Sequence, residues 1–280
     1  MIKNKIWTDQ AILNALEEDI GSGDITTDAI IPSEIEGAAV LETRENMVLA
    51  GLPVFCRVFE LISSKIRFSE FFHDSDPLPR NAKICTVTGP LSAILKGERT
   101  ALNFIQRMSG IATLTREYVT KASPGKAKIL DTRKTAPGLR RFDKYAVRMG
   151  GGSNHRIGLF DGVLIKDNHI TVAGSISRAV KIAKDNAPNA INVEVEVENL
   201  EGVEEAVRAG ADIILLDNMN LQEIKKAVDL VQGRVLLEAS GGVNLDNITD
   251  IARTGVDFIS VGALTHSSRA MDLSLEMVPQ

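Results

Sequence analysis

The segment from Asp131 to Arg156, DTRKTAPGLRRFDKYAVRMGGGSNHR, carries seven Lys or Arg residues and one His against two acidic residues. The whole chain of 280 residues has a formal net charge of −5. Lysine and arginine bind carboxylates and phosphates, and arginine can do so through two parallel hydrogen bonds. The segment therefore predicts a site for a small anionic ligand, and the alternative is an ordinary solvated face.

Further polar side chains follow short apolar runs in the second half of the chain. The runs AKILD, GVLIK, DIILLD, RVLLEAS and DFISVG lead into Asp131, Lys166, Asp217, Ser240 and Gly262. The active sites of parallel α/β barrels are assembled from the carboxyl ends of the strands. We therefore expect one basic cluster at this end, made of Arg133, Lys134, His155, Arg156 and Lys166.

The run INVEVEV and the residue after it carry Glu194, Glu196 and Glu198, which the period of two places on one face of a strand. Helices should cover the outside of a barrel, so this face points inward. Buried carboxylates are costly unless they meet cations, and Lys166 and Lys134 are the candidates. Glu194 and Glu198 could equally form ion pairs that never touch a substrate. Glu196 is the stronger candidate for function, and with Asp217 it could hold Mg²⁺.

Small residues after the last two strands predict a phosphate site. Ser240, Gly241 and Gly242 precede an expected helix, and Gly262 follows the final strand. Such residues let backbone N–H groups and a helix N-terminus approach phosphate oxygens. The three glycines at 150–152 match no P-loop pattern and instead indicate an unusual backbone near the site.

The elements that must position these residues change in kind along the chain. Residues 1 to about 110 mix helices, including PLSAILKGERTALNFIQRM, with short strands in no regular order. From about residue 127, six strands alternate with helices expected near 172–185, 200–209, 221–231 and 244–253, which is typical of parallel βα units. A complete barrel needs about 250 residues, so the shorter segment predicts an open or truncated barrel.

Composition excludes several classes of function. The acidic balance argues against a general nucleic-acid or membrane-surface binder. No apolar stretch is long enough to span a membrane, so we expect a soluble, cytoplasmic protein. Cys56 and Cys85 lack metal-ligand spacing and are expected to be free, partly buried thiols in a reducing compartment.

The motifs GERTALNFIQRMSGIAT, DTRKTAPGLR, KYAVRMGGGSNHR, LIKDNHI, VEVEVENLEG, IILLDN, LEASGGV and ISVGALTHS occur in this order. Together they resemble the quinolinate phosphoribosyltransferase family over nearly the whole chain. The resemblance implies an N-terminal α/β sandwich domain at 1–111, joined by the tail 270–280, and an incomplete α/β barrel at 112–269. It also implies Mg²⁺ as cofactor and a homodimer with a shared active site, with hexamers left open.

The implied reaction joins quinolinate to 5-phosphoribosyl-1-pyrophosphate and releases pyrophosphate and CO₂ to give nicotinate mononucleotide in NAD biosynthesis. By matching motifs, the quinolinate carboxylates would be bound by Arg133, His155, Arg156 and Lys166, with Arg99 from the neighbouring subunit. Lys134 would contact the pyrophosphate, and Glu196 and Asp217 the ribose hydroxyls and Mg²⁺. The 5′-phosphate would lie on Ser240, Gly241, Gly242 and Gly262.

The resemblance gives no role to Arg140, Arg141, Lys144 and Arg148, which we expect to be solvated, paired or at a subunit interface. Catalysis is expected from positioning and electrostatics by Lys134, Lys166, Glu196 and Asp217, without a covalent enzyme intermediate.

Two alternatives stay open at this point. One is another enzyme of the same structural superfamily, such as a nicotinate phosphoribosyltransferase or the relative from molybdenum loci. The other is a non-catalytic sensor of phosphoribosyl compounds. The intact NHR and KDNH segments argue against the first alternative, and the joint presence of Lys166, Glu196 and Asp217 argues against the second.

Overall fold

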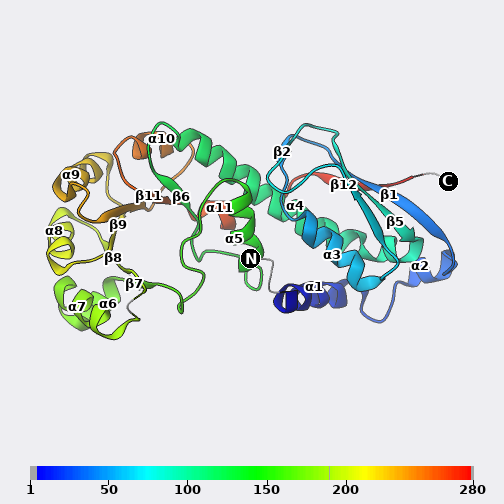
Figure 1. Cartoon of the computed structure of the whole chain (residues 1–280), viewed down its shortest axis with the longest axis horizontal. Helices are drawn as coiled ribbons and strands as arrows, with labels where there is room; N and C mark the ends of the chain where they lie inside the picture. The colour runs from blue at the N-terminus through cyan, green and yellow to red at the C-terminus, as the bar shows by residue number, and fades with distance from the viewer. Residues whose placement is uncertain (1–4, 189, 279–280) are drawn as a thin grey trace. The chain divides into compact units, whose positions relative to one another are not determined.

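The protein is described by a computed structural model over residues 5–188 and 190–278. The chain forms two compact units, which Figure 1 shows. The first unit contains the described residues of Met1–Arg116, Thr135–Gly151 and Ser267–Gln280. The second contains Glu117–Lys134 and Gly152–His266. None of the helices in the described part of the chain is long and apolar enough to cross a membrane.

The first unit is built on an antiparallel sheet with the strand order β12-β1-β5-β3. Its strands are β1 (Glu36–Thr43), β3 (Arg67–Glu70), β5 (Lys83–Pro90) and β12 (Leu273–Met277), and β2 (Met47–Val48) pairs separately with β4 (Pro77–Leu78). The C-terminal tail therefore contributes β12, which pairs with β1.

The helices of the first unit are α1 (Lys5–Ile20), α2 (Ile25–Ile30), α3 (Leu52–Ile62), α5 (Arg140–Met149) and the long α4 (Leu91–Ala122), which continues into the second unit. Helix α3 buries a strongly apolar face that includes Phe55 and Phe59, whose rings pack edge to face. The predicted domain boundary between residues 111 and 112 falls inside the continuous α4.

Helix α5 explains most of the basic residues for which the sequence suggested no role. Arg140 donates a hydrogen bond to Thr135, Arg141 lies over the ring of Trp7, and Arg148 lies over Tyr145. The side chain of Lys144 is fully buried within the first unit, so of the three expected states, solvated, paired or at an interface, burial excludes the solvated one. The charge excess of this segment is therefore structural in its middle part.

The second unit is an open α/β barrel, and this confirms the predicted fold class. Six parallel strands run in the order β6-β11-β10-β9-β8-β7, and β6 and β7 are the two edges. They are β6 (Lys128–Leu130), β7 (Val163–Ile165), β8 (Val193–Val197), β9 (Ile213–Asp217), β10 (Leu236–Ser240) and β11 (Phe258–Ser260). All six correspond to the apolar runs read from the sequence.

Helices cover the outer side of these strands, as Figure 1 shows. They are α6 (Asp167–Ala173), α7 (Ile176–Asn186), α8 (Leu200–Ala209), α9 (Leu221–Val231) and α10 (Ile248–Ala252). The short helix α11 (Ala263–His266) follows β11 and is not part of this outer layer. Asparagine and serine caps begin three of them: Ser175, Asn199 and Asn220 each accept a backbone N–H of the first turn. With helices outside, every second strand residue points into the barrel.

The close approach of α4 to the C-terminal tail gives a test of the first unit. A Cβ added at Gly110 would overlap the backbone carbonyl oxygen of Arg269, which cannot move as a side-chain tip can. We expect Gly110→Ala to lower the free energy of unfolding by about 1–3 kcal/mol, although alanine normally favours a helix over glycine. Thermal unfolding would measure this, with Glu117→Ala on the exposed surface of the same helix as the control. An unchanged melting temperature for Gly110→Ala would contradict the packing.

Candidate active site

A cavity of about 430 Å³ lies at the carboxyl ends of the barrel strands. Its wall combines basic, acidic and small residues from all six strands or the turns after them. Those that the sequence singled out are Arg133, Lys134, His155, Arg156, Lys166, Glu196, Asp217, Ser240, Gly241 and Gly242. The structure thus brings together residues that are up to about a hundred positions apart in the chain.

The guanidinium groups of Arg133 and Arg156 both line this cavity, and their positive charges repel each other. Arg133 follows β6, and Arg156 follows the glycine-rich turn. Burial and then repulsion from Arg133 lower the pKa of Arg156, while Glu194 and Asp161 act in the opposite direction. Like charges held this close favour an anion between them.

The acidic side of the cavity starts from an ion pair that involves Lys166, one of the two cations expected to meet the inward-facing glutamates. The ammonium group of Lys166, at the end of β7, donates a hydrogen bond to the carboxylate of Glu196 on β8. Asp217 ends β9 and accepts a hydrogen bond from the side chain of Asn218 at 2.9 Å. Glu198, in contrast, lies beyond the end of β8 and is exposed, so it is not one of the inward-facing carboxylates.

The turn after β10 has the open backbone expected of a phosphate cradle. Gly241 and Gly242 both have positive φ, 91° and 62°, which favours glycine. A Cβ at Gly241 would collide with the side chain of Asn218, whereas Gly242 has free space around it. Helix α10 begins only at Ile248, so backbone N–H groups, and not a helix N-terminus, would face a phosphate here.

Gly262 lies in a second small-residue turn, immediately before α11. A Cβ at this position would press on the side chains of Lys134 and His266. The backbone carbonyl of Lys134 accepts a hydrogen bond from Thr265 at 2.8 Å, which fixes this lysine beside Gly262. The arrangement puts a cation, Lys134, next to the Gly262 turn.

Asp131 holds the NHR segment in place, a role that the sequence did not reveal. Its buried carboxylate accepts the backbone N–H of His155 at 2.9 Å and the side-chain amide of Asn154. Ser153 pairs with Leu130 as an extension of the sheet edge at β6. Arg156 reaches the other edge, where it donates to the carbonyl oxygen of Gly162 at 3.0 Å, just before β7. The segment thereby spans the opening of the barrel.

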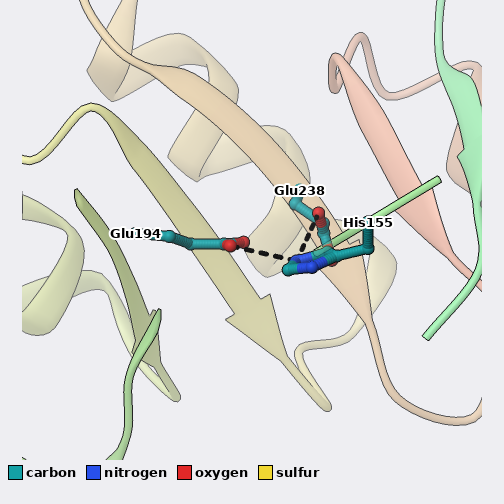
Figure 2. A group of neighbouring side chains, drawn as sticks. All are labelled: His155, Glu194 and Glu238. Carbon is teal, nitrogen blue, oxygen red and sulfur yellow. Dashed lines mark ion pairs between the residues drawn. The ribbon is translucent and has the colours of Figure 1, made fainter. Parts of the chain in front are cut away.

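His155 turns its ring toward two buried glutamates, as Figure 2 shows. Its Nε2 lies 3.0 Å from Glu194 Oε2 and 3.7 Å from Glu238 Oε2. The backbone N–H of Arg156 donates to His155 Nδ1 at 2.7 Å, so Nδ1 carries no proton and the ring hydrogen is on Nε2. Because both ring nitrogens have protein partners, the predicted role of His155 as a ligand of the substrate stays a prediction.

Glu238 is the most perturbed acid of the site. It lies on β10, two residues before Ser240, and is 1% exposed. Burial and then repulsion by Glu194 raise the pKa of Glu238 to about 7, and His155 offsets part of this effect. Residues two positions apart in a strand lie on the same face, so Glu238 shares the inward face with Ser240 in RVLLEAS. This spacing could have revealed Glu238 from the sequence.

Arg99 is the one predicted site residue placed in the first unit. It lies on α4 and is exposed. The cavity-lining residues of the second unit do not include it. Its action on the barrel of a neighbouring subunit stays a prediction.

Comparison with known proteins agrees with this geometry. The model of the quinolinate phosphoribosyl transferase C-terminal domain matches residues 111–276, and that of the N-terminal domain matches residues 24–109. A nicotinate-nucleotide pyrophosphorylase (carboxylating) of Arabidopsis thaliana is 44% identical, covering 94% of this chain and 80% of that protein.

Solved structures extend the similarity to the whole fold. A nicotinate-nucleotide pyrophosphorylase from Francisella tularensis has a TM-score of 0.92 at 45% identity, covering 97% of this chain and 96% of that one. The NadC protein of Streptococcus pyogenes has a TM-score of 0.94 at 42% identity, with 96% of each chain covered. The chain described here belongs to the quinolinate phosphoribosyl transferase family.

Proposed function

We propose that this protein transfers the phosphoribosyl group of 5-phosphoribosyl-1-pyrophosphate to quinolinate, with loss of CO₂, to form nicotinate mononucleotide and pyrophosphate. The observation that carries the proposal is the single cavity in which four cations adjoin two strand-end carboxylates and a glycine turn. The names of the relatives support the same reaction. As a carboxylating nicotinate-nucleotide diphosphorylase, the enzyme would serve NAD biosynthesis.

Two neighbouring carboxylates on one ring match the arrangement of the cations. Arg133 and Arg156 repel each other in the absence of an anion, and a dicarboxylate between them would remove this repulsion. Lys166 lies in the same cavity, where it is paired with Glu196. A substrate carboxylate that draws Lys166 away would free Glu196 to accept the hydroxyls of the ribose.

The second substrate is a polyanion that needs its own contacts. The turns at Gly241 and Gly262 suit the 5′-phosphate, and Lys134 beside Gly262 suits the pyrophosphate. Glu196 and Asp217 offer carboxylate oxygens at adjacent strand ends, which is the donor type that Mg²⁺ prefers. We therefore assign Mg²⁺ to these two residues, directly or through water, where it would neutralise phosphate charge.

The remaining chemistry depends on position and charge. As pyrophosphate leaves, positive charge develops on the ribose carbon, and Glu196 and Asp217 stabilise it. When both substrates are bound in one cavity, their reacting atoms are held in a fixed orientation, so the reaction no longer depends on a chance encounter of two molecules. No nucleophilic side chain is required by this scheme, so we expect no covalent intermediate.

The homodimer and its shared site are part of the same proposal. Arg99 is exposed on α4, as a residue that completes the quinolinate site of a second copy must be. Assembly of dimers into hexamers is compatible with this arrangement. Buried, unpaired Cys56 and Cys85 support a reducing compartment, which for this protein would be the cytoplasm.

The reaction itself can be tested with the purified protein. With 5-phosphoribosyl-1-pyrophosphate and Mg²⁺, we expect quinolinate to be consumed with one CO₂ per nicotinate mononucleotide formed. Nicotinate, which has a single carboxylate, should not be a substrate. Turnover of nicotinate alone, without CO₂ from quinolinate, would refute the proposed function, and tight binding of the phosphoribosyl donor without turnover would favour a sensor.

The cation pair gives a second prediction. Arg133→Ala should weaken quinolinate binding by at least about 100-fold, because a charge-assisted pair between guanidinium and carboxylate contributes roughly 3 kcal/mol. Isothermal titration with quinolinate would measure the loss. Arg140→Ala on α5 is the matched control, since Arg140 bonds Thr135 in the first unit. Equal affinities of the wild type and Arg133→Ala would mean that quinolinate binds elsewhere.

The shared site gives a third prediction. Arg99→Ala and Lys166→Ala should each be inactive as pure homodimers, because each lacks one part of every site. Mixing and refolding the two variants should restore up to about a quarter of the wild-type activity, since half of the dimers are hybrid and each has one intact site. Activity assays before and after subunit exchange would show this, and no recovery in verified hybrids would exclude the shared site.

A further inference from the structure

Two carboxylates lie buried behind the proposed substrate ring and share few donors. Glu194 is 4% exposed and Glu238 is 1% exposed, and both point toward the Nε2 of His155 (Figure 2). The second oxygen of each carboxylate, Oε1, is buried without a hydrogen-bond partner in the described part of the protein. One N–H at Nε2 cannot satisfy two ionised carboxylates in a site with so little solvent.

These three side chains come close enough to hold a metal ion, but the hydrogen bonding of His155 argues against one. A histidine that binds a metal through Nε2 normally donates a hydrogen bond from Nδ1. Here Nδ1 accepts the backbone N–H of Arg156 at 2.7 Å. A proton on Nε2 and a second proton on one carboxylate fit the geometry better.

We propose that Glu238 carries this second proton and is the acid that protonates the ring carbon from which CO₂ departs, an inference that rests on the function proposed above. Glu238 lines the same cavity as Arg133, Arg156 and Lys166. Glu194 accepts the Nε2–H of His155 at 3.0 Å.

The bond between ring carbon 2 and its carboxylate breaks, CO₂ leaves, and the electron pair stays on the carbon beside the ribosylated nitrogen. The O–H bond of Glu238 then breaks, and its proton forms the new C–H bond. Glu238 is left as a carboxylate, which must regain a proton before the next turnover.

A second cavity provides a path for that proton. A hollow of about 420 Å³ opens at the amino ends of the strands, where Lys128, Val163 and Phe258 begin β6, β7 and β11. It shares Glu238, His155 and Arg156 with the active-site cavity. Glu238 therefore lies in the partition between the two, and water at the far end can return its proton without displacing the substrate.

The charges around Glu238 favour its protonated form at neutral pH. Burial and then repulsion by Glu194 on β8 raise the pKa of Glu238, and Asp131 at the end of β6 adds a smaller repulsion, whereas His155 and a hydrogen bond from Ser260 on β11 act in the opposite direction. Arg156, Lys128 and Asp161 also line the cavities in which it lies. Its strand neighbours Leu215 on β9 and Phe258 on β11 carry no charge. A dianionic substrate would strengthen the preference for the proton.

Glu238→Gln tests the proposal, because glutamine keeps the shape but has no acidic proton. We expect kcat to fall by about 100-fold or more, the lower end of the range for general acids, with the KM for quinolinate changed less than about threefold. In the wild type, kcat/KM should fall tenfold per pH unit above neutrality as Glu238 loses its proton. This alkaline decline should be absent in Glu238→Gln.

Glu204→Gln, the same change at an exposed position on α8, is the control and should match the wild type. Wild-type conversion of quinolinate to product and CO₂ establishes the proposed function independently. If Glu238→Gln then keeps kcat and the alkaline decline, or loses only quinolinate affinity, the inference about Glu238 is wrong while the function stands.

Glu194→Gln decides the question if Glu238→Gln fails to fold. Removing the repulsion from Glu194 should move the alkaline decline of kcat/KM to lower pH, because Glu238 then loses its proton more easily. An alkaline decline at the wild-type pH would overturn the proposal.

Discussion

Charge balance inside a partly closed barrel is the constraint on which the site depends. Several cations must face a dicarboxylate and a polyphosphate, yet they must also remain folded together when no substrate is bound. The barrel meets this requirement with carboxylates on a neighbouring strand: Lys166 at the end of β7 pairs with Glu196 on β8, and Glu194 on β8 attracts Arg156. Because burial weakens the screening of these charges, each pair affects both the stability of the empty site and its affinity for anions.

Because the barrel is open, an irregular segment between β6 and β7 takes the place of strand pairing at the gap. Strands β6 and β7 are the edges of the sheet and do not pair with each other. The stretch from Ser153 to Gly162 joins them, through the bridge to Leu130 at one edge and the hydrogen bond from Arg156 at the other. The same stretch carries His155 and Arg156, and Arg156 lines the cavity together with Arg133, which repels it. The opening of the barrel therefore carries two of the side chains proposed to bind the substrate.

Local patterns in the sequence predicted the six barrel strands and the helices α8 and α9 to the residue, and they named Lys166 as one of two candidate partners for the inward-facing glutamates. The spacing of apolar residues and the polar residues at the strand ends are enough for these predictions, because they depend mainly on residues close together in the chain. They could not predict that Lys144 is buried, or that residues 135–151 pack in the first unit, since both follow from contacts distant in sequence. Glu238 was overlooked because a single acid in an apolar strand carries little signal without its partners Glu194 and His155.

The buried pair of Glu194 and Glu238 in the barrel interior is not explained by the packing of apolar side chains. Two buried carboxylates with unpartnered oxygens destabilise the fold relative to apolar side chains of similar size. Leu164 and Leu215 line the same cavity, so apolar residues fit this interior. Burying the pair with one carboxyl group protonated costs less free energy than burying two ionised carboxylates. The retained proton is useful only where a reaction consumes a proton. The loss of CO₂ from a ribosylated pyridine is such a reaction, which connects the two buried carboxylates of the barrel with its proposed chemistry.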